Sequence, residues 1–170
     1  MENAPDLVQF CRDEYSRLVG SLGLFCGDVD LAEELANEAL MRACRDWNKV
    51  RNLASPTAWV HAVGMNLARS HFRRKAAERR ATERLQSRSV ASPEATEQSD
   101  AITIRSAVAG LPARQKKALV LRYYVDLRID EIAEAMDCSP STVKSLVRSA
   151  LRSLRDKEGF AHLEEVGDAV

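Results

Sequence analysis

The spacing of apolar residues predicts that this chain is built from helices. Apolar side chains recur at three- and four-residue steps, and we find no alternating run with the turn signals of a hairpin. Between residues 28 and 47, one such stripe comprises Val29, Ala32, Ala36, Leu40, Ala43 and Trp47. Aromatic residues make up only 5% of the chain, and Ala, Leu, Arg and Glu are abundant, which also favours helix. We therefore predict an all-α fold.

A strip poor in large apolar residues divides the chain in two. Residues 85–100, LQSRSVASPEATEQSD, are rich in Ser, Ala, Glu, Thr and Pro and cannot bury enough apolar surface to fold alone. We predict that they form a flexible linker between helical domains at 5–84 and 101–157. Residues 158–170 carry four acids and no base. Two interpretations stay open for them: a frayed tail, or a regulatory tail that screens a basic surface.

The net charge of zero conceals two basic blocks. Residues 51–84 hold eight bases and two acids, and residues 101–157 hold eleven bases and six acids. Residues 1–50 are acidic, with ten acids and five bases. Because polyanions respond to local charge rather than to the total, each domain has a segment suited to nucleic acid.

Within the first basic block we predict a helix that begins at Ser55-Pro56, because Ser is a good N-cap and Pro suits the first helical position. Its core stripe consists of Trp59, Val60, Val63 and Leu67. Met65 and Phe72 fall on another side, which indicates burial between neighbours or a surface for a partner. Its basic residues are Arg69, Arg73, Arg74, Lys75, Arg79, Arg80 and Arg84. A solvated helix end is the plain alternative, but this density of positive charge favours nucleic acid.

The second block contains the pattern of a helix-turn-helix. Residues 130–136 predict a short helix with acids in its first turn, and Asp137-Cys138-Ser139 predicts a tight turn. Ser139 then caps a second helix that has Pro140 at its first position.

Two faces are predicted for that second helix. The apolar stripe comprises Val143, Val147, Ala150 and Leu154. The opposite face carries Ser141, Lys144, Ser145, Arg148, Arg152 and Arg155 and no acid. A helix of this kind, held across a shorter one, fits the major groove of DNA. The alternative is a surface helix with incidental basic charge, although such helices usually intersperse acids.

Other classes of function find little support in the sequence. The four cysteines form no C-x-x-C pair and the three histidines are scattered, so we expect reduced thiols and no metal site. We find no glycine-rich phosphate loop and no nucleophile–base pair, and we predict no catalytic residue and no cofactor. No run approaches the length of a membrane span and no secretory signal begins the chain, so we expect a cytoplasmic protein.

Together these segments resemble the extracytoplasmic-function group of the sigma-70 family. The segment DLAEELANEALMRACRDW (30–47) resembles the one that grips the clamp coiled coil of the largest polymerase subunit. The resemblance implies that Glu34, Asn37 and Glu38 face the polymerase, whereas periodicity alone indicates a solvated face there. The implied fold is a helical bundle like sigma region 2 followed by a helix-turn-helix domain like sigma region 4.

Two further segments carry the resemblance to DNA-reading parts of the family. SPTAWVHAVGMNLARSHFRRK (55–75) resembles the segment that opens and reads the −10 element, which implies contacts from Asn66, Arg69, Arg73, Arg74 and Lys75. LPARQKKALVLRYY (111–124) and DEIAEAMDCSPSTVKSLVRSALRSLR (130–155) resemble the −35-reading domain. There the implied contacts are Ser141, Thr142, Lys144, Ser145, Arg148 and Arg152.

The resemblance implies a sigma factor that binds core RNA polymerase, recognises promoter DNA and promotes melting. An anti-sigma factor is left open as a further partner. Three departures from the family pattern matter here. Arg128 stands where Ser or Thr often caps a helix, which removes about 1 kcal/mol of capping. Ser141 and Leu146 also depart from the pattern, so the −35 sequence preference does not carry over.

The main alternative is a two-domain helix-turn-helix regulator that acts without joining the polymerase. Such a protein needs an effector pocket or a receiver domain in its first half, where this chain instead has a basic helix. An anti-sigma or adaptor protein is a second alternative, but it does not require two cationic faces.

Overall fold

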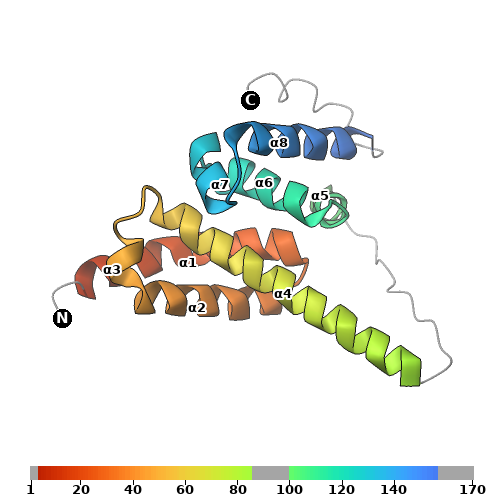
Figure 1. Cartoon of the computed structure of the whole chain (residues 1–170), viewed down its shortest axis with the longest axis horizontal. Coiled ribbons are helices and arrows are strands. Elements are labelled where there is room, and N and C mark those ends of the chain that lie inside the picture. The colour runs from red at the N-terminus through yellow and green to blue at the C-terminus, as the bar shows by residue number, and fades with distance from the viewer. Residues whose placement is uncertain (1–3, 86–99, 157–170) are drawn as a thin grey trace.

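The computed structural model describes residues 4–85 and 100–156, and its regular structure there is entirely helical, as predicted (Figure 1). The first domain contains α1 (Ala4–Cys26), α2 (Val29–Arg45), α3 (Trp47–Val50) and α4 (Pro56–Leu85). The second contains α5 (Asp100–Ala109), α6 (Ala113–Tyr123), α7 (Ile129–Ala135) and α8 (Pro140–Arg155). Nearly all of the predicted linker and the whole acidic tail lie outside the described residues. In the described part of the chain, no helix is long and apolar enough to cross a bilayer.

The first domain is a bundle in which α1, α2 and α4 pack against one another. Leu18 and Leu22 of α1 are fully buried at its centre. Gly64 brings α4 close to α1, since a Cβ there would lie 3.0 Å from a methyl carbon of Leu22. The small residues of the α2 stripe, Ala32, Ala36 and Ala43, are likewise fully buried. Short side chains thus let the helix backbones approach closely.

Both ends of the predicted α2 stripe need correction. Val29 is 53% exposed and does not belong to the core. It is the first helical residue after Asp28, whose carboxylate caps the helix by accepting from the Leu31 backbone N–H. Trp47 is buried but begins the separate helix α3, and its ring packs against Phe10 with the centroids 5.1 Å apart.

A buried polar network joins α1 to α4. His61 and Ser21 have no exposed surface and Glu14 is 8% exposed. The His61 Nδ1 lies 2.8 Å from the Ser21 hydroxyl, and its Nε2 lies 3.3 Å from a Glu14 carboxylate oxygen. Thr57 donates to the other Glu14 oxygen at 2.6 Å. Burial by itself raises the pKa of Glu14, but the hydrogen bonds from His61 and Thr57 outweigh it and lower that pKa.

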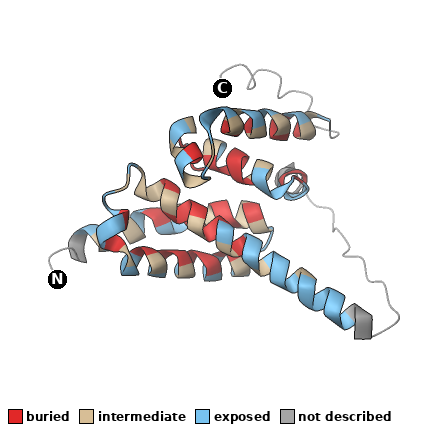
Figure 2. Cartoon of the chain, in the orientation of Figure 1, coloured by how far each residue is buried: buried red, intermediate tan, exposed pale blue. Residues whose placement is uncertain are grey.

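The helix α4 begins in the bundle and ends outside it. Ser55 caps its start as predicted, accepting from the Ala58 N–H at 3.2 Å. Met65 is 1% exposed, so its position on a second apolar side reflects burial between neighbouring helices. From Arg69 to Arg80 the helix projects away from the bundle, and most of its side chains are exposed (Figure 2). The basic residues from Arg73 to Arg80 thus lie on the part of α4 that makes little contact with the fold.

In the second domain, α6, α7 and α8 pack around a core that includes Leu121, Ile132, Val143 and Val147. The segment from Asp137 to Ser139 forms the predicted tight turn, and Asp137 adopts a φ of 50° in the left-handed region. Aspartate tolerates that conformation better than most residues do. The turn sets α8 across α7 as a helix-turn-helix requires.

The two domains pack against each other, which the sequence did not predict. The helices α5 and α6 contact α1, and α6 and α7 contact α4 (Figure 1). The Arg17 guanidinium donates to the Val125 carbonyl, and the Lys116 ammonium donates to the Phe25 carbonyl at 3.3 Å. Gly20 admits the Tyr124 ring, because a Cβ at Gly20 would overlap the tyrosine hydroxyl. The second domain therefore covers one side of the first.

We predict that Glu14→Gln lowers the free energy of unfolding by about 1–3 kcal/mol near neutral pH, because the variant loses a charged partner of His61. The lowered pKa of Glu14 means that its contribution is complete above the unfolded pKa of about 4.5 and is lost as the pH falls through and below it. The deficit should therefore shrink on acidification. Urea unfolding at a series of pH values measures it.

The matched control is Asp13→Asn, one residue earlier on the exposed side of α1. It should change stability little at any pH. A deficit in Glu14→Gln that stays constant down to acid pH would contradict the assignment.

Candidate nucleic-acid and polymerase interfaces

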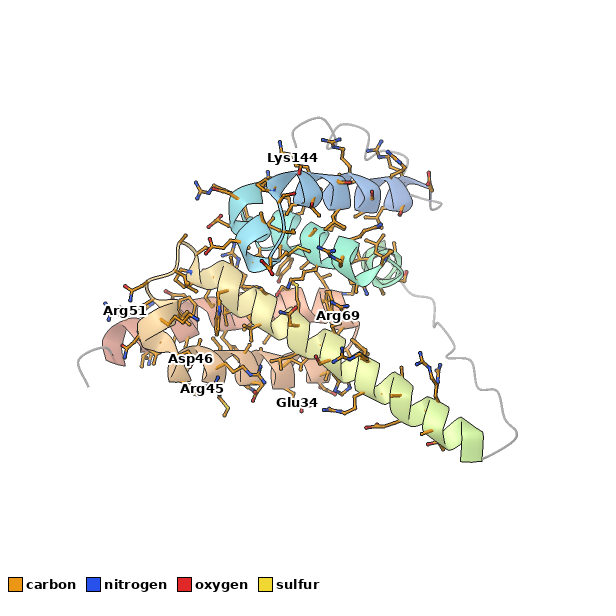
Figure 3. The ribbon with its side chains drawn as sticks, in the orientation of Figure 1. Glu34, Arg45, Asp46, Arg51, Arg69 and Lys144 are labelled. Carbon is orange, nitrogen blue, oxygen red and sulfur yellow. The ribbon has the colours of Figure 1, made fainter. Side chains whose placement is uncertain are left out.

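The helix α8 presents a face of the kind that enters a DNA groove. Its four predicted stripe residues, Val143, Val147, Ala150 and Leu154, are all buried, which confirms that side as core. On the other side Ser145, Arg148 and Arg152 are exposed. Lys144 is only half-buried and also projects from the helix on the side away from α4 (Figure 3). The packing of the stripe therefore determines which residues face outward.

Hydroxyl groups gather at the N-terminus of α8. The Ser139 Oγ accepts from the Thr142 backbone N–H at 3.2 Å, as the predicted cap requires. The same oxygen lies 2.8 Å from the hydroxyls of both Ser141 and Thr142. In a helix-turn-helix, the N-terminal residues of the second helix are usually the ones that contact DNA base edges, and these short polar groups lie at that end of α8. Leu146, by contrast, packs against the core.

The start of α7 is capped in a way that the sequence analysis missed. The Arg128 side chain has no acceptor to offer, as predicted, but the Glu131 carboxylate accepts from the Arg128 backbone N–H at 2.8 Å. The guanidinium of Arg128 also lies 3.5 Å from the carboxylates of Asp130 and Glu131. A carboxylate three residues into the helix thus replaces part of the missing cap. A Glu three residues after the N-cap position is the sequence signal that indicates this cap.

The cations predicted to contact the −10 element lie on the projecting part of α4. Arg69, Arg73, Arg74 and Lys75 are all exposed. The Arg74 guanidinium lies 4.0 Å from the Glu78 carboxylate, and both side chains are about 70% exposed. An exposed pair of this kind contributes little to stability, so it leaves Arg74 available to a phosphate.

Asn66 differs from those cations because it is engaged by the second domain. Its Oδ1 accepts from the Lys117 ammonium at 3.1 Å. Lys117 is 9% exposed, and burial, followed by the charge of Arg69, lowers its pKa to about 8. Lys117 is 51 residues from Asn66 along the chain, and no sequence pattern indicates that the two side chains meet.

The residues predicted to face the polymerase lie together on α2. Glu34 and Asn37 are exposed, and Glu38 accepts from Arg42 at 2.8 Å one turn further on. Met41, beside them, is 66% exposed. Figure 3 shows Glu34 projecting from the side of the molecule opposite to Lys144. The acidic face and the cationic helix therefore point in different directions.

The described residues contain no group of three or more His, Cys, Asp or Glu side chains that is suited to a metal ion. The Sγ atoms of Cys11 and Cys44 lie 3.9 Å apart, and burial raises the pKa of Cys11 to about 11. The Cys11 thiol is therefore protonated at neutral pH, and the thiolate is the form that binds metals.

Two family models match the chain in order. The model for sigma-70 region 2 matches residues 3–78, and the model for sigma-70 region 4 matches residues 102–154. The RNA polymerase sigma-E factor of Streptomyces antibioticus is 30% identical over 79% of this chain and 74% of its own length. The sigma factor EcfG of Rhodopseudomonas palustris is 28% identical over 87% of this chain and 84% of its own.

A solved structure has a similar fold. It is the sigma factor RpoE of Bartonella quintana, crystallised in complex with the anti-sigma factor NepR. It superposes with a TM-score of 0.74, covers 89% of this chain and 95% of its own, and is 24% identical in sequence. That coverage includes helices from both domains.

We predict that Ser139→Ala lowers the free energy of unfolding by about 1 kcal/mol, because the Thr142 N–H loses its acceptor at the start of α8. Thermal or chemical denaturation measures the change. Ser145→Ala is the control, since Ser145 is exposed within the helix and caps nothing. Equal stability of the two variants would refute the capping role.

Proposed function

The chain belongs to the extracytoplasmic-function group of the sigma-70 family, and from this premise we propose how its two domains share the work of initiation. The protein binds core RNA polymerase and directs it to promoter DNA. The observation that carries this function is the ordered pair of region 2 and region 4 matches, on two helical domains that each present cations. A regulator independent of polymerase is not favoured, because region 2 occupies the part where an effector or receiver domain would be needed.

The exposed face of α2 is the proposed contact with the polymerase. Glu34, Asn37 and Glu38 place two carboxylates and an amide on one side of a rigid helix. The exposed Met41 adds apolar area to this side. A patch that combines acidic groups with an adaptable apolar residue suits a cationic partner surface.

The projecting part of α4 is the proposed contact with the −10 element. Arg73, Arg74 and Lys75 supply positive charge for phosphates. Phe72 is 40% exposed among them, with its ring edge-on to His71 at 5.7 Å between centroids. Exposed aromatic rings beside cations favour unstacked bases, which offsets part of the energy required to open the duplex. Phe72 thus joins the candidate site.

The outer face of α8 is the proposed contact with the −35 element. Ser141 and Thr142 stand at the end of the helix that reaches base edges, and Lys144, Ser145, Arg148 and Arg152 continue along the groove. The protein acts by binding and not by catalysing a reaction, and we place it in the cytoplasm with the polymerase. By analogy with the structure that contains NepR, an anti-sigma factor is a further proposed partner.

We predict that the double variant Glu34→Lys/Glu38→Lys loses association with core polymerase by at least about tenfold, because it reverses the charge of the proposed contact. Co-purification and fluorescence anisotropy with labelled protein measure this. Asp13→Lys, exposed on α1, is the matched control and should bind normally. Normal binding by the double variant would remove α2 from the interface.

We predict that Arg148→Ala weakens −35-dependent initiation by about 1–3 kcal/mol if its guanidinium reads a base. Run-off transcription with core polymerase, from templates with intact and substituted −35 elements, measures the change. The variant should also discriminate less between those templates. An unchanged preference would assign Arg148 to the surface charge of the helix.

The experiment that tests the function as a whole is reconstituted transcription. The purified protein is added to core polymerase with genomic DNA fragments, and the RNA 5′ ends are mapped. Start sites that share −10 and −35 elements and require the protein are expected. Failure to bind the core enzyme would overturn the proposal, even if the protein binds DNA alone.

A further inference from the structure

A small cavity lies where the second domain covers the first. It has a volume of about 80 Å³ and is lined by residues of α4 and α6, together with Phe25 and Met136. A single water needs roughly 10–15 Å³ of such volume, so the cavity has room for a small oxyanion. It exists only while the domains are packed together.

Three cations line this cavity, and none of its lining residues is acidic. They are Arg69 from α4 and Arg114 and Lys117 from α6. Neither arginine makes an ion pair with any described residue, and the one hydrogen bond of the Lys117 side chain is to the neutral amide of Asn66. A buried ammonium with no counter-charge is costly. The charges of Arg69 and Arg114 add to burial in lowering the Lys117 pKa, so the group favours an anion.

The backbone supports the same preference. The helix α6 begins at Ala113, which also lines the cavity, and its N-cap residue Pro112 supplies no side-chain hydrogen bond. The backbone N–H groups of the first turn therefore lack a side-chain acceptor. They add partial positive charge to that of the three cations.

We propose that this cavity binds the phosphate group of a small phosphorylated ligand and that the bound group holds the two domains together. The phosphate oxygens would accept from Arg69, Arg114 and Lys117, which come from both domains. A ligand held there would occupy the Arg69 guanidinium and keep Asn66 bonded to Lys117, and so oppose promoter contact by these two residues of α4. This regulatory consequence rests on the proposed function, but binding itself does not.

The test is calorimetric titration of the full chain with inorganic phosphate and with pyrophosphate at constant ionic strength. Saturable binding is expected, and Arg114→Ala and Lys117→Gln should each weaken it at least about tenfold. Arg12→Ala, which removes a charge from an exposed position outside the cavity, should bind like the unmodified protein. Small-angle X-ray scattering should show a more compact molecule when phosphate is added.

Several outcomes would overturn the proposal. The first is the absence of saturable binding of phosphate or pyrophosphate, and the second is equal weakening of that binding by Arg12→Ala. The third is binding that is seen with DNA oligonucleotides only and that Arg114→Ala leaves intact. Arg114 is exposed, so its variant keeps the test decisive even if Lys117→Gln fails to fold. Nucleoside diphosphates distinguish a larger ligand from free phosphate. The titration contains no polymerase. A lack of phosphate binding would therefore leave the proposed function untouched, and a failed transcription assay would leave the phosphate site untouched.

Discussion

The packing of α4 against α1 determines where the candidate −10 interface lies and forms the surface against which the second domain packs. Gly64 allows the two helices to approach closely, and the network of Glu14, His61 and Ser21 ties them with oriented polar contacts. Because a buried polar network is favourable only when its members are paired, it restricts the two helices to one register. The first half of α4 is thereby held in the core, and its cationic second half projects away from it.

The contact between the domains follows a different physical logic. The Arg17 guanidinium and the Lys116 ammonium both donate hydrogen bonds to backbone carbonyls there. At Asn66 and Lys117, however, a cation is buried beside two others with no carboxylate among them. A contact that contains uncompensated charge is weaker than its area implies. Such an interface is therefore easier to open than a fully paired one of the same area.

The predictable parts of the site are those governed by local rules. The Ser139 cap and the stripe through Val143 and Val147 follow from residue type and helical spacing, and the structure confirms both. Val29 fails as a core residue because spacing alone does not show where a helix begins relative to its neighbours. Glu131 follows the same local rules, because a Glu three residues after the N-cap position can accept from the backbone N–H there.

The amino-acid sequence by itself determined the all-helical class, the two domains and the family, because helical periodicity, caps and motif order are local properties. The tertiary structure alone decided that Lys117 meets Asn66 and that Tyr124 rests against Gly20. These residues are far apart in the chain, and none carries a pattern that names its partner. Contacts of that kind depend on how two finished surfaces fit, which local spacing does not encode.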